Sequence, residues 1–177
     1  MLQTLKEVFM TLKKRKGYKA IDVSRFIIYY CQKKNNPVSN LRLQKMLYFI
    51  QSYYLCKKNR PCFKDNIEAW RFGPVVPNVY HQFKNYGALP IPHETEYLSY
   101  ENNEWWNATM VKYSDNMISP ADKKIISEIV DELSEFSSSH LVETTHSQKP
   151  WKDAYQIGNN TIITNEALKG YFWGKWK

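Results

Sequence analysis

The stretch 37-PVSNLRLQKMLYFIQSYYL-55 decides how the rest of the chain is interpreted. Its apolar residues fall at i, i+3, i+4, i+7 and i+11, the spacing that places them on one face of a helix; they are Leu43, Met46, Leu47, Ile50 and Tyr54. We expect Ser39 or Asn40 to cap its start, because a short side-chain oxygen there accepts from free backbone N–H groups. A polar break at Lys57–Arg60 should end the helix.

The next block, 67-IEAWRFGPVVPNVYHQFKNYG-87, predicts an extended segment over 67–72 followed by a second helix. We expect the chain to reverse at Gly73-Pro74, because glycine lacks a Cβ and proline fixes φ near the value that a turn requires. Pro77 suits the first position of a helix. The apolar stripe Val79, Tyr80, Phe83 and Tyr86 then continues to Gly87, a candidate C-cap.

Two longer helices are expected on either side of this region. The first covers Ile21–Lys34 and ends at Asn35-Asn36-Pro37, because the residue before proline is pushed out of the α region. The second begins at Ser119-Pro120-Ala121-Asp122, with a serine cap and a proline at the first helical position, and runs to about Phe136. Shorter helices are predicted over His140–Ser147, from Pro150-Trp151 onward, and over Asn165–Trp173, with a hairpin within Glu94–Tyr113 around Glu101-Asn102-Asn103.

These patterns predict an α+β fold that is predominantly helical, a single compact domain with a small antiparallel β element. A chain of 177 residues is long enough for one such domain. Its 43% hydrophobic and 15% aromatic content favours a packed core over disorder. No run approaches the ~18 apolar residues of a membrane span, and the N-terminus lacks a secretory signal, so we expect a cytoplasmic protein with no membrane partner.

The basic N-terminal segment Met1–Lys16 is predicted to be an amphipathic helix that ends at Gly17. We therefore divide the chain into a basic helical extension, 1–17, and a domain, 18–177. Residues 1–60 hold 14 basic residues against two acidic ones, a balance of +12 within a net charge of +8. Such a field steers acidic partners or nucleic acid toward one end of a molecule. The segment is either a helix packed on the domain or a partner-binding arm, and its candidate binding residues are Lys13, Lys14, Arg15 and Lys16.

No catalytic, cofactor or metal motif is present. The sequence contains no P-loop, no G-x-G-x-x-G, no G-x-S-x-G and no H-E-x-x-H. Cys31, Cys56 and Cys62 cannot all pair and lack C-x-x-C spacing, so neither a disulfide framework nor a zinc knuckle is indicated. A cysteine–histidine nucleophile pair is the remaining enzymatic alternative, and structural roles for these residues outweigh it. We expect no enzyme and no cofactor.

Two strings carry a family resemblance: S-N-L-x-L-Q-K-M-L-Y-F at Ser39–Phe49 and E-A-W-x-x-G-P-V-V-P-x-V-Y at Glu68–Tyr80. Tyr86-Gly87 and the weaker T-H-x-x-x-P-W at Thr145–Trp151 continue it. The chain resembles the SocA-like (Panacea) antitoxin domain family, which includes phage-associated proteins, from about Ala20 to about Tyr171. The resemblance implies an antitoxin that neutralises a cognate protein toxin by direct binding, in some relatives by delivering it to a protease.

The motif positions serve either as scaffold or as recognition surface: Asn40, Leu43, Gln44, Lys45, Leu47, Tyr48, Glu68, Trp70, Gly73, Pro74, Pro77, Tyr80, His146 and Trp151. If Gln44 and Glu68 are buried they need hydrogen-bond partners, and Lys45 or Arg71 would suit the carboxylate of Glu68. His146 is either a ligand or general base, or a hydrogen-bonded side chain that locks one helix end to the next. A lone histidine without a second ligand favours the structural role.

The rival interpretation is a nucleic-acid-binding protein of phage or mobile-element origin. Lys13–Lys16 and Lys57–Arg60 could follow phosphates while aromatic side chains stack on bases; the candidates are Tyr53, Tyr54, Trp70 and Phe72. No helix-turn-helix or RNP-like signature supports this. Nucleic acid is therefore a less favoured partner than a protein toxin, and the sequence leaves homo-oligomerisation open.

Overall fold

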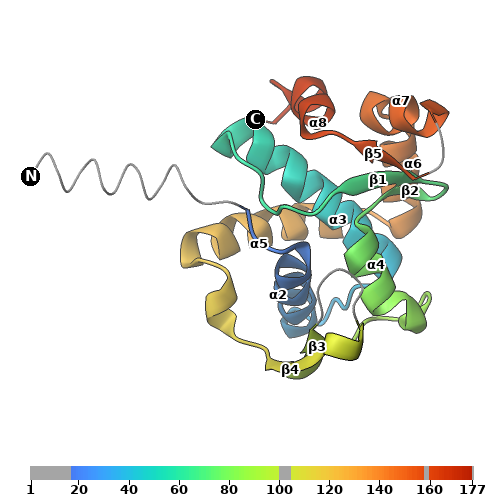
Figure 1. The fold of residues 1–177 in the computed structure, drawn as a ribbon. Coiled ribbons are helices and arrows are strands. Elements are labelled where there is room, and N and C mark those ends of the chain that lie inside the picture. Colours follow the sequence, from blue (N-terminus) through green and yellow to red (C-terminus); the bar gives the residue numbers. More distant parts are fainter. Residues whose placement is uncertain (1–16, 100–104, 158–159, 177) are drawn as a thin grey trace, which may run out of the picture.

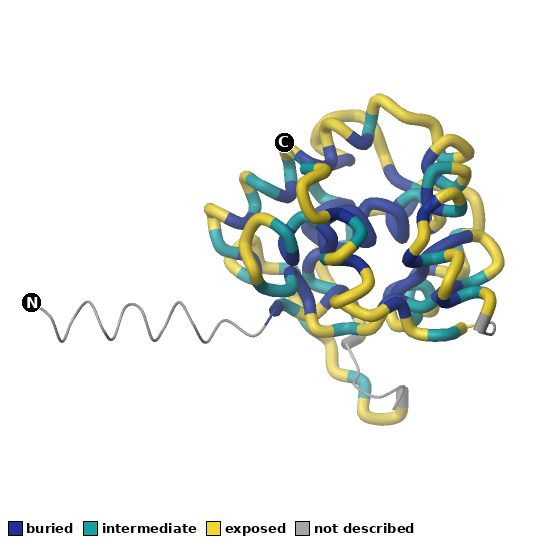
Figure 2. Tube along the Cα trace, turned by 90° about the horizontal axis from the view of Figure 1, so that it is seen from above, coloured by how far each residue is buried: buried dark blue, intermediate teal, exposed yellow. Residues whose placement is uncertain are grey.

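Helix α3 (Asn40–Tyr53) lies at the centre of the computed structural model, which describes residues 17–99, 105–157 and 160–176 (Figures 1 and 2). Every residue from Leu43 to Ser52 is buried, so this helix is covered on all sides and not only along the predicted apolar stripe. The polar residues within this run, Gln44, Lys45, Gln51 and Ser52, are buried together with the apolar ones. Such a helix requires neighbours on all sides and partners for each polar group.

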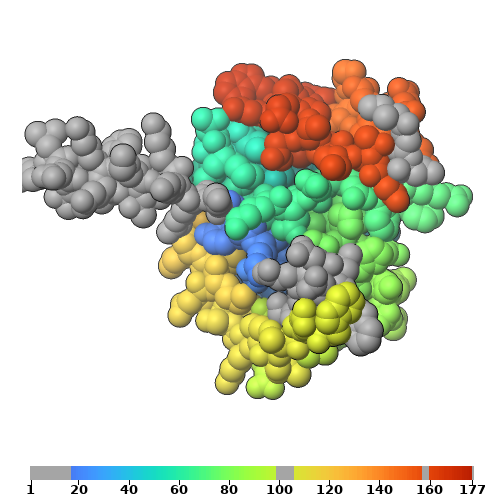
Figure 3. All heavy atoms as spheres, viewed as in Figure 1, coloured from blue at the N-terminus to red at the C-terminus, as the bar shows by residue number. Residues whose placement is uncertain are grey.

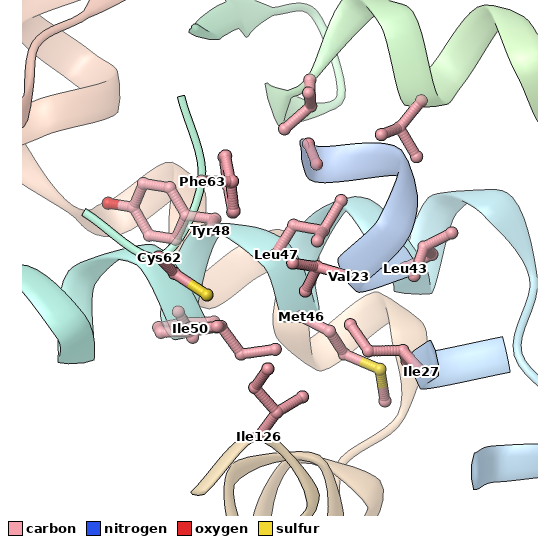
Figure 4. Packing of buried hydrophobic residues seen from close by; sticks show 14 of the residues in the cluster. Val23, Ile27, Leu43, Met46, Leu47, Tyr48, Ile50, Cys62, Phe63 and Ile126 are labelled. Carbon is pink, nitrogen blue, oxygen red and sulfur yellow. The ribbon is translucent and has the colours of Figure 1, made fainter. Parts of the chain in front are cut away.

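The described part of the chain has six further helices, and all of them except α7 pack on α3. They are α2 (Ala20–Lys33), α4 (Pro77–Phe83), α5 (Pro120–Ser134), α6 (Ser138–Ser147), α7 (Lys149–Ile157) and α8 (Asn165–Phe172). Figure 4 shows Val23 and Ile27 of α2 and Ile126 of α5 packing against Leu43, Met46 and Ile50 of α3. Burying a side chain of this size contributes about 1.5–3 kcal/mol, which explains why the central helix organises the fold.

The predicted start of α5 is confirmed, and the predicted cap of α3 is wrong. Ser119 Oγ accepts from the backbone N–H of Asp122, and Pro120 occupies the first turn of α5. Ser39 holds the N-cap position of α3 but its side chain makes no capping bond. The side chain of Asn40 is used elsewhere, since it donates to the carbonyl of Tyr80.

The polar break after α3 does not end the helix directly. The chain continues as a π-helical turn, η1 (Tyr54–Lys58), and stops at Asn59, which has a left-handed φ of 52°. Asparagine tolerates this conformation better than most residues, and π-turns are rare enough to mark local adjustment. The turn carries Lys57 and Lys58 outward while Tyr54 stays buried.

Strand β1 (Ile67–Trp70) is the middle of a three-stranded antiparallel sheet, ordered β2-β1-β5. It pairs with β2 (Gly73–Val75) through Trp70↔Gly73 and with β5 (Thr161–Ile163) through Glu68↔Ile162. The predicted reversal at Gly73-Pro74 is wrong by two residues, because Arg71 and Phe72 form the turn and Gly73-Pro74 begins β2. The sequence did not predict β5.

The predicted hairpin within 94–113 is confirmed as a separate two-stranded sheet. It consists of β3 (Glu96–Ser99) and β4 (Thr109–Lys112), and its expected turn at 101–103 falls outside the described residues. Short 3-10 turns complete the chain: η2 (Lys84–Tyr86), η3 (Trp105–Asn107) and η4 (Asp115–Met117). Gly87 is the C-cap of η2 with a φ of 57°, so the predicted cap position is confirmed.

The fold class is confirmed: one predominantly helical α+β domain with small antiparallel sheets. The helix expected over Met1–Lys16 lies outside the described residues, so the division of the chain at Gly17 stays a prediction. Within the described part of the chain, no helix is long and apolar enough to cross a membrane.

Candidate functional site

Lys45 and Gly73 form the centre of the motif residues. Lys45 is 0% exposed, and its Nζ donates to the carbonyl of Pro74 at 3.0 Å. Burial lowers the pKa of this ammonium to about 7. Gly73 has a φ of 98°, and a Cβ there would lie 2.6 Å from Nζ of Lys45 and 3.0 Å from Oγ1 of Thr145. Glycine is therefore required both by its backbone conformation and by the space.

Two amides of α3 hold the connection between β2 and α4. Gln44 Oε1 accepts from the N–H of Val76 at 2.8 Å, and its Nε2 donates to Asn40 Oδ1 at 2.9 Å. Asn40 Nδ2 in turn donates to the carbonyl of Tyr80 at 3.1 Å. The buried backbone groups of an irregular connection need such partners, and the two side chains provide them.

The outer face of β1 carries Glu68 and Trp70, which share one side of the strand because side chains alternate. The indole N–H of Trp70 donates to Glu68 Oε2 at 2.8 Å, and that of Trp151 donates to the carbonyl of Trp70 at 3.1 Å. The predicted pairing of Glu68 with Lys45 or Arg71 is therefore wrong. Trp70, on the same strand face, donates to the carboxylate of Glu68, and Lys45 donates instead to the carbonyl of Pro74.

His146 is held by stacking. Its ring lies 4.2 Å from that of Trp151, which stacks in turn on Tyr155 at 4.7 Å. Burial, assisted by the charge of Lys45, lowers the pKa of His146. Its Nε2 is buried and has no hydrogen-bond partner, which differs from the predicted hydrogen-bonded lock. Among the described residues, no group of three histidines, cysteines or acids could hold a metal ion.

The structure places most of the motif inside the molecule. Buried motif residues are Asn40, Leu43, Gln44, Lys45, Leu47, Tyr48, Gly73 and Pro74; half-buried ones are Glu68, Trp70, Pro77, Tyr80, His146 and Trp151. Tyr48 is fully buried, and its hydroxyl donates to Gln148 Oε1 at 2.8 Å. Pro77 begins α4, as predicted. The candidate partner-binding residues Lys13, Lys14, Arg15 and Lys16 lie outside the described residues.

A small exposed surface adjoins this buried network, and we call it the turn surface: Arg71, Phe72 and Ile162. Phe72 is 63% exposed at the β1–β2 turn, and the guanidinium of Arg71 lies 5.5 Å from its ring centre. Ile162 of β5 is 48% exposed, on the outward face opposite Glu68. Sequence reasoning assigned Phe72 to the nucleic-acid alternative alone. The sequence predicted an extended segment over 67–72, so it did not separate Phe72 from the buried residues of the strand.

A second polar cluster, around Asp122, was not predicted. Its carboxylate accepts from the hydroxyls of Tyr18 at 2.6 Å, Tyr54 at 2.9 Å and Ser119 at 2.9 Å, and from Arg60 Nη2 at 2.7 Å. Burial alone would raise the pKa of Asp122, but these hydrogen bonds and the charge of Arg60 together hold it below its ordinary value.

The Asp122 cluster weakens the nucleic-acid interpretation. It engages Tyr54, which is fully buried, and Arg60, which is ion-paired. Neither side chain is then free to stack on a base or follow a phosphate. Only Lys57 and Lys58 remain exposed as the cationic part of that segment.

The surroundings of the cysteines disfavour them as nucleophiles. Burial raises the pKa of the Cys31 thiol to about 11 and also raises those of Cys56 and Cys62. A thiol must lose its proton to attack a substrate, and burial in apolar surroundings opposes this.

The geometry therefore defines a folded scaffold in which most of the motif residues are turned inward. The family model described as "Antitoxin SocA-like, Panacea domain" matches residues 43–152, and the chain belongs to this family. Over 55 residues it is 49% identical to the Antitoxin SocA of Caulobacter vibrioides (strain NA1000 / CB15N). That match covers 31% of this chain and only 29% of the relative. No solved structure matches the chain.

Proposed function

We propose that this protein is a cytoplasmic antitoxin that neutralises a cognate protein toxin by direct binding, without catalysis of its own. Membership of the SocA-like family is the observation that carries the proposal. The inward network of Gln44, Lys45 and Gly73 supports it, because it fixes a turn rigidly where the chain exposes an aromatic side chain. The free cysteines suit a reducing compartment.

The turn surface is the interface that we assign to the toxin. Aromatic residues and arginine contribute most strongly to protein–protein binding when a rigid backbone presents them. Phe72 and Arg71 combine these two residue types at one turn, whose backbone is anchored by the bond from Lys45 to Pro74. Little conformational entropy is then lost on binding.

The basic residues Lys13, Lys14, Arg15 and Lys16 are proposed to assist capture. Charges at the rim of an interface mainly raise the rate of association and contribute less to affinity. They would attract an acidic face of the toxin toward this end of the molecule.

A growth assay tests the proposed function. The product of each gene that flanks this one is expressed alone and together with this chain, and we expect one product to arrest growth unless the chain is present. Phe72→Ala should abolish rescue, whereas Leu89→Ala, at an equally exposed residue in another segment, should not. Unchanged toxin levels would indicate blocking by binding, and protease-dependent loss of toxin would indicate delivery to a protease.

Nucleic-acid binding is the second candidate, favoured by the net charge of +8. A nucleic-acid-binding protein should bind random DNA, and its affinity should fall steeply as salt is raised, because binding displaces counterions from the phosphates. Binding of that kind, with no rescue against either neighbouring product, would replace the antitoxin proposal.

A further inference from the structure

A groove with a volume of about 360 Å³ runs along one side of α5. Apolar side chains line it, Ile125 and Ile129 of α5 together with Tyr53 and Trp176, and so do two acids of α5, Glu128 and Glu132. The groove therefore combines a hydrophobic strip with negative charge.

Two observations indicate that the groove is suited to binding a further segment. The indole N–H of Trp176 is buried without a hydrogen-bond acceptor, an arrangement that folded proteins usually avoid. Glu128 and Glu132 are exposed, and no ion pair within the described residues engages either one. The nearest cation of the groove, Lys175, lies over the ring of Tyr171 at 3.2 Å.

We propose that the chain's own segment Met1–Lys16 docks in this groove as an amphipathic helix. Its apolar stripe of Leu2, Leu5, Phe9 and Leu12 matches the hydrophobic floor, and its five cations against the single acid Glu7 match the acidic side chains. On a helix, Lys6 and Lys13 flank the apolar stripe, where they would meet Glu132 and Glu128. Lys14 falls on the opposite side and would stay exposed to a partner.

The point at which the described chain begins supports this placement. Gly17 is packed against Cys62 and Phe63, the N–H of Tyr18 donates to the carbonyl of Cys62 at 2.8 Å, and the Tyr18 hydroxyl donates to Asp122. Asp122 lies in the first turn of α5, three residues before Ile125. In Figure 3 the blue start of the described chain emerges between α5 and the end of α3.

The segment 1–16 is long enough to cover the groove, and its covalent link to Gly17 favours docking. Sixteen helical residues span roughly 24 Å, whereas Ile125 to Glu132 covers about 10 Å of α5, so the segment passes the whole groove when it runs antiparallel to that helix. A short tether also gives a local concentration in the millimolar range, so modest contacts suffice. This inference stands independently of toxin binding.

Hydrogen exchange of the full-length protein tests the proposal. In the wild type, we expect the amides of residues 5–13 to exchange at least about tenfold more slowly than in an unstructured peptide. Glu128→Lys with Glu132→Lys should remove this protection, and adding Lys6→Glu with Lys13→Glu should restore it. Glu143→Lys with Glu166→Lys, at exposed acids of α6 and α8, is the matched control and should leave protection unchanged.

Three results would overturn the proposal. The first is exchange of the wild-type segment at the unprotected rate. The second is protection that survives reversal of the groove charges in a variant with a normal melting temperature, because the segment would then dock elsewhere. The third is protection that increases with protein concentration, because the occupant would then come from a second copy.

Discussion

The glycine at motif position 73 is required because of its backbone angle and its close neighbours. Its φ of 98° and the ammonium of Lys45 leave no room for a side chain. We expect Gly73→Ala to lower the free energy of unfolding by about 2–4 kcal/mol, the sum of backbone strain and a displaced buried lysine. Gly170→Ala is the control, since a Cβ there meets nothing within 4 Å in helix α8. Urea denaturation that gives equal stabilities for the two variants would contradict the role assigned to Gly73.

Lys45 makes stability depend on pH in a defined direction. Its pKa is about 7 in the folded protein and about 10.4 when unfolded, so the unfolded chain binds more protons between these values. Stability should therefore rise with pH above 7, by up to about 1.4 kcal/mol per pH unit near pH 8 to 9. Lys45→Met should remove this slope. Parallel stability curves for the variant and the wild type between pH 7 and 9 would show that the amine is not held neutral.

At the scale of elements, the Asp122 cluster joins three segments that are distant in sequence. Tyr18 leads into α2, Tyr54 begins η1 with Arg60 just after it, and Asp122 lies in the first turn of α5. Asp122→Asn leaves Arg60 without its anion, and we expect a loss of about 2–3 kcal/mol in thermal or urea unfolding.

The acid dependence of the Asp122→Asn effect gives a second check. The folded pKa of Asp122 is depressed, so its contribution is present above about pH 4 and is lost as pH falls through the folded value. The difference in the free energy of unfolding between wild type and Asp122→Asn should therefore shrink as the pH falls below about 4. Asp153→Asn, which breaks an exposed pair with Lys149, should cost no more than about 0.5 kcal/mol. An equal cost for both variants would contradict the importance of the cluster.

Elements with strong local signals were predictable, and elements that depend on distant partners were not. The cap and periodicity of α5 identified it, and the turn-forming residues Glu101-Asn102-Asn103 between two extended stretches indicated the β3–β4 hairpin. Strands β2 and β5 have three residues each, too few to show a period, and they exist because β1 lies between them. The same limit explains the wrong partner for Glu68. Charge suggested Lys45 or Arg71, but strand geometry brought the indole of Trp70 closer.

Sequence reasoning found the residues of the candidate site but not their orientation. Gln44, Lys45 and Gly73 were identified as motif positions, and only the fold shows that they face inward. The exposed Phe72 carries no periodic signal that separates it from a buried strand residue. The Asp122 cluster could not be predicted because Tyr18, Tyr54 and Arg60 lie 62 to 104 residues from Asp122 in sequence.

For the whole molecule, we propose that the basic N-terminal end attracts a charged partner toward that end. Reversing Lys14, Arg15 and Lys16 together, which leaves the groove contact proposed for Lys13 in place, should slow association with the toxin while the melting temperature stays close to that of the wild type. Screening over ~8 Å at physiological ionic strength should reduce the difference as salt is raised. Equal association rates for wild type and variant at low and high salt would remove this segment from capture.

We propose that the chain neutralises its toxin by direct binding through the rigidly held turn at Arg71 and Phe72. The most direct measurement is calorimetric titration of the purified chain into the neighbouring toxin, for wild type and Phe72→Ala. We predict a stable complex with the wild type, and a Kd at least about tenfold weaker for Phe72→Ala, equivalent to about 1.4 kcal/mol, with an unchanged melting temperature. Rescue of growth by a wild-type protein that shows no binding to the toxin at micromolar concentration would contradict the account.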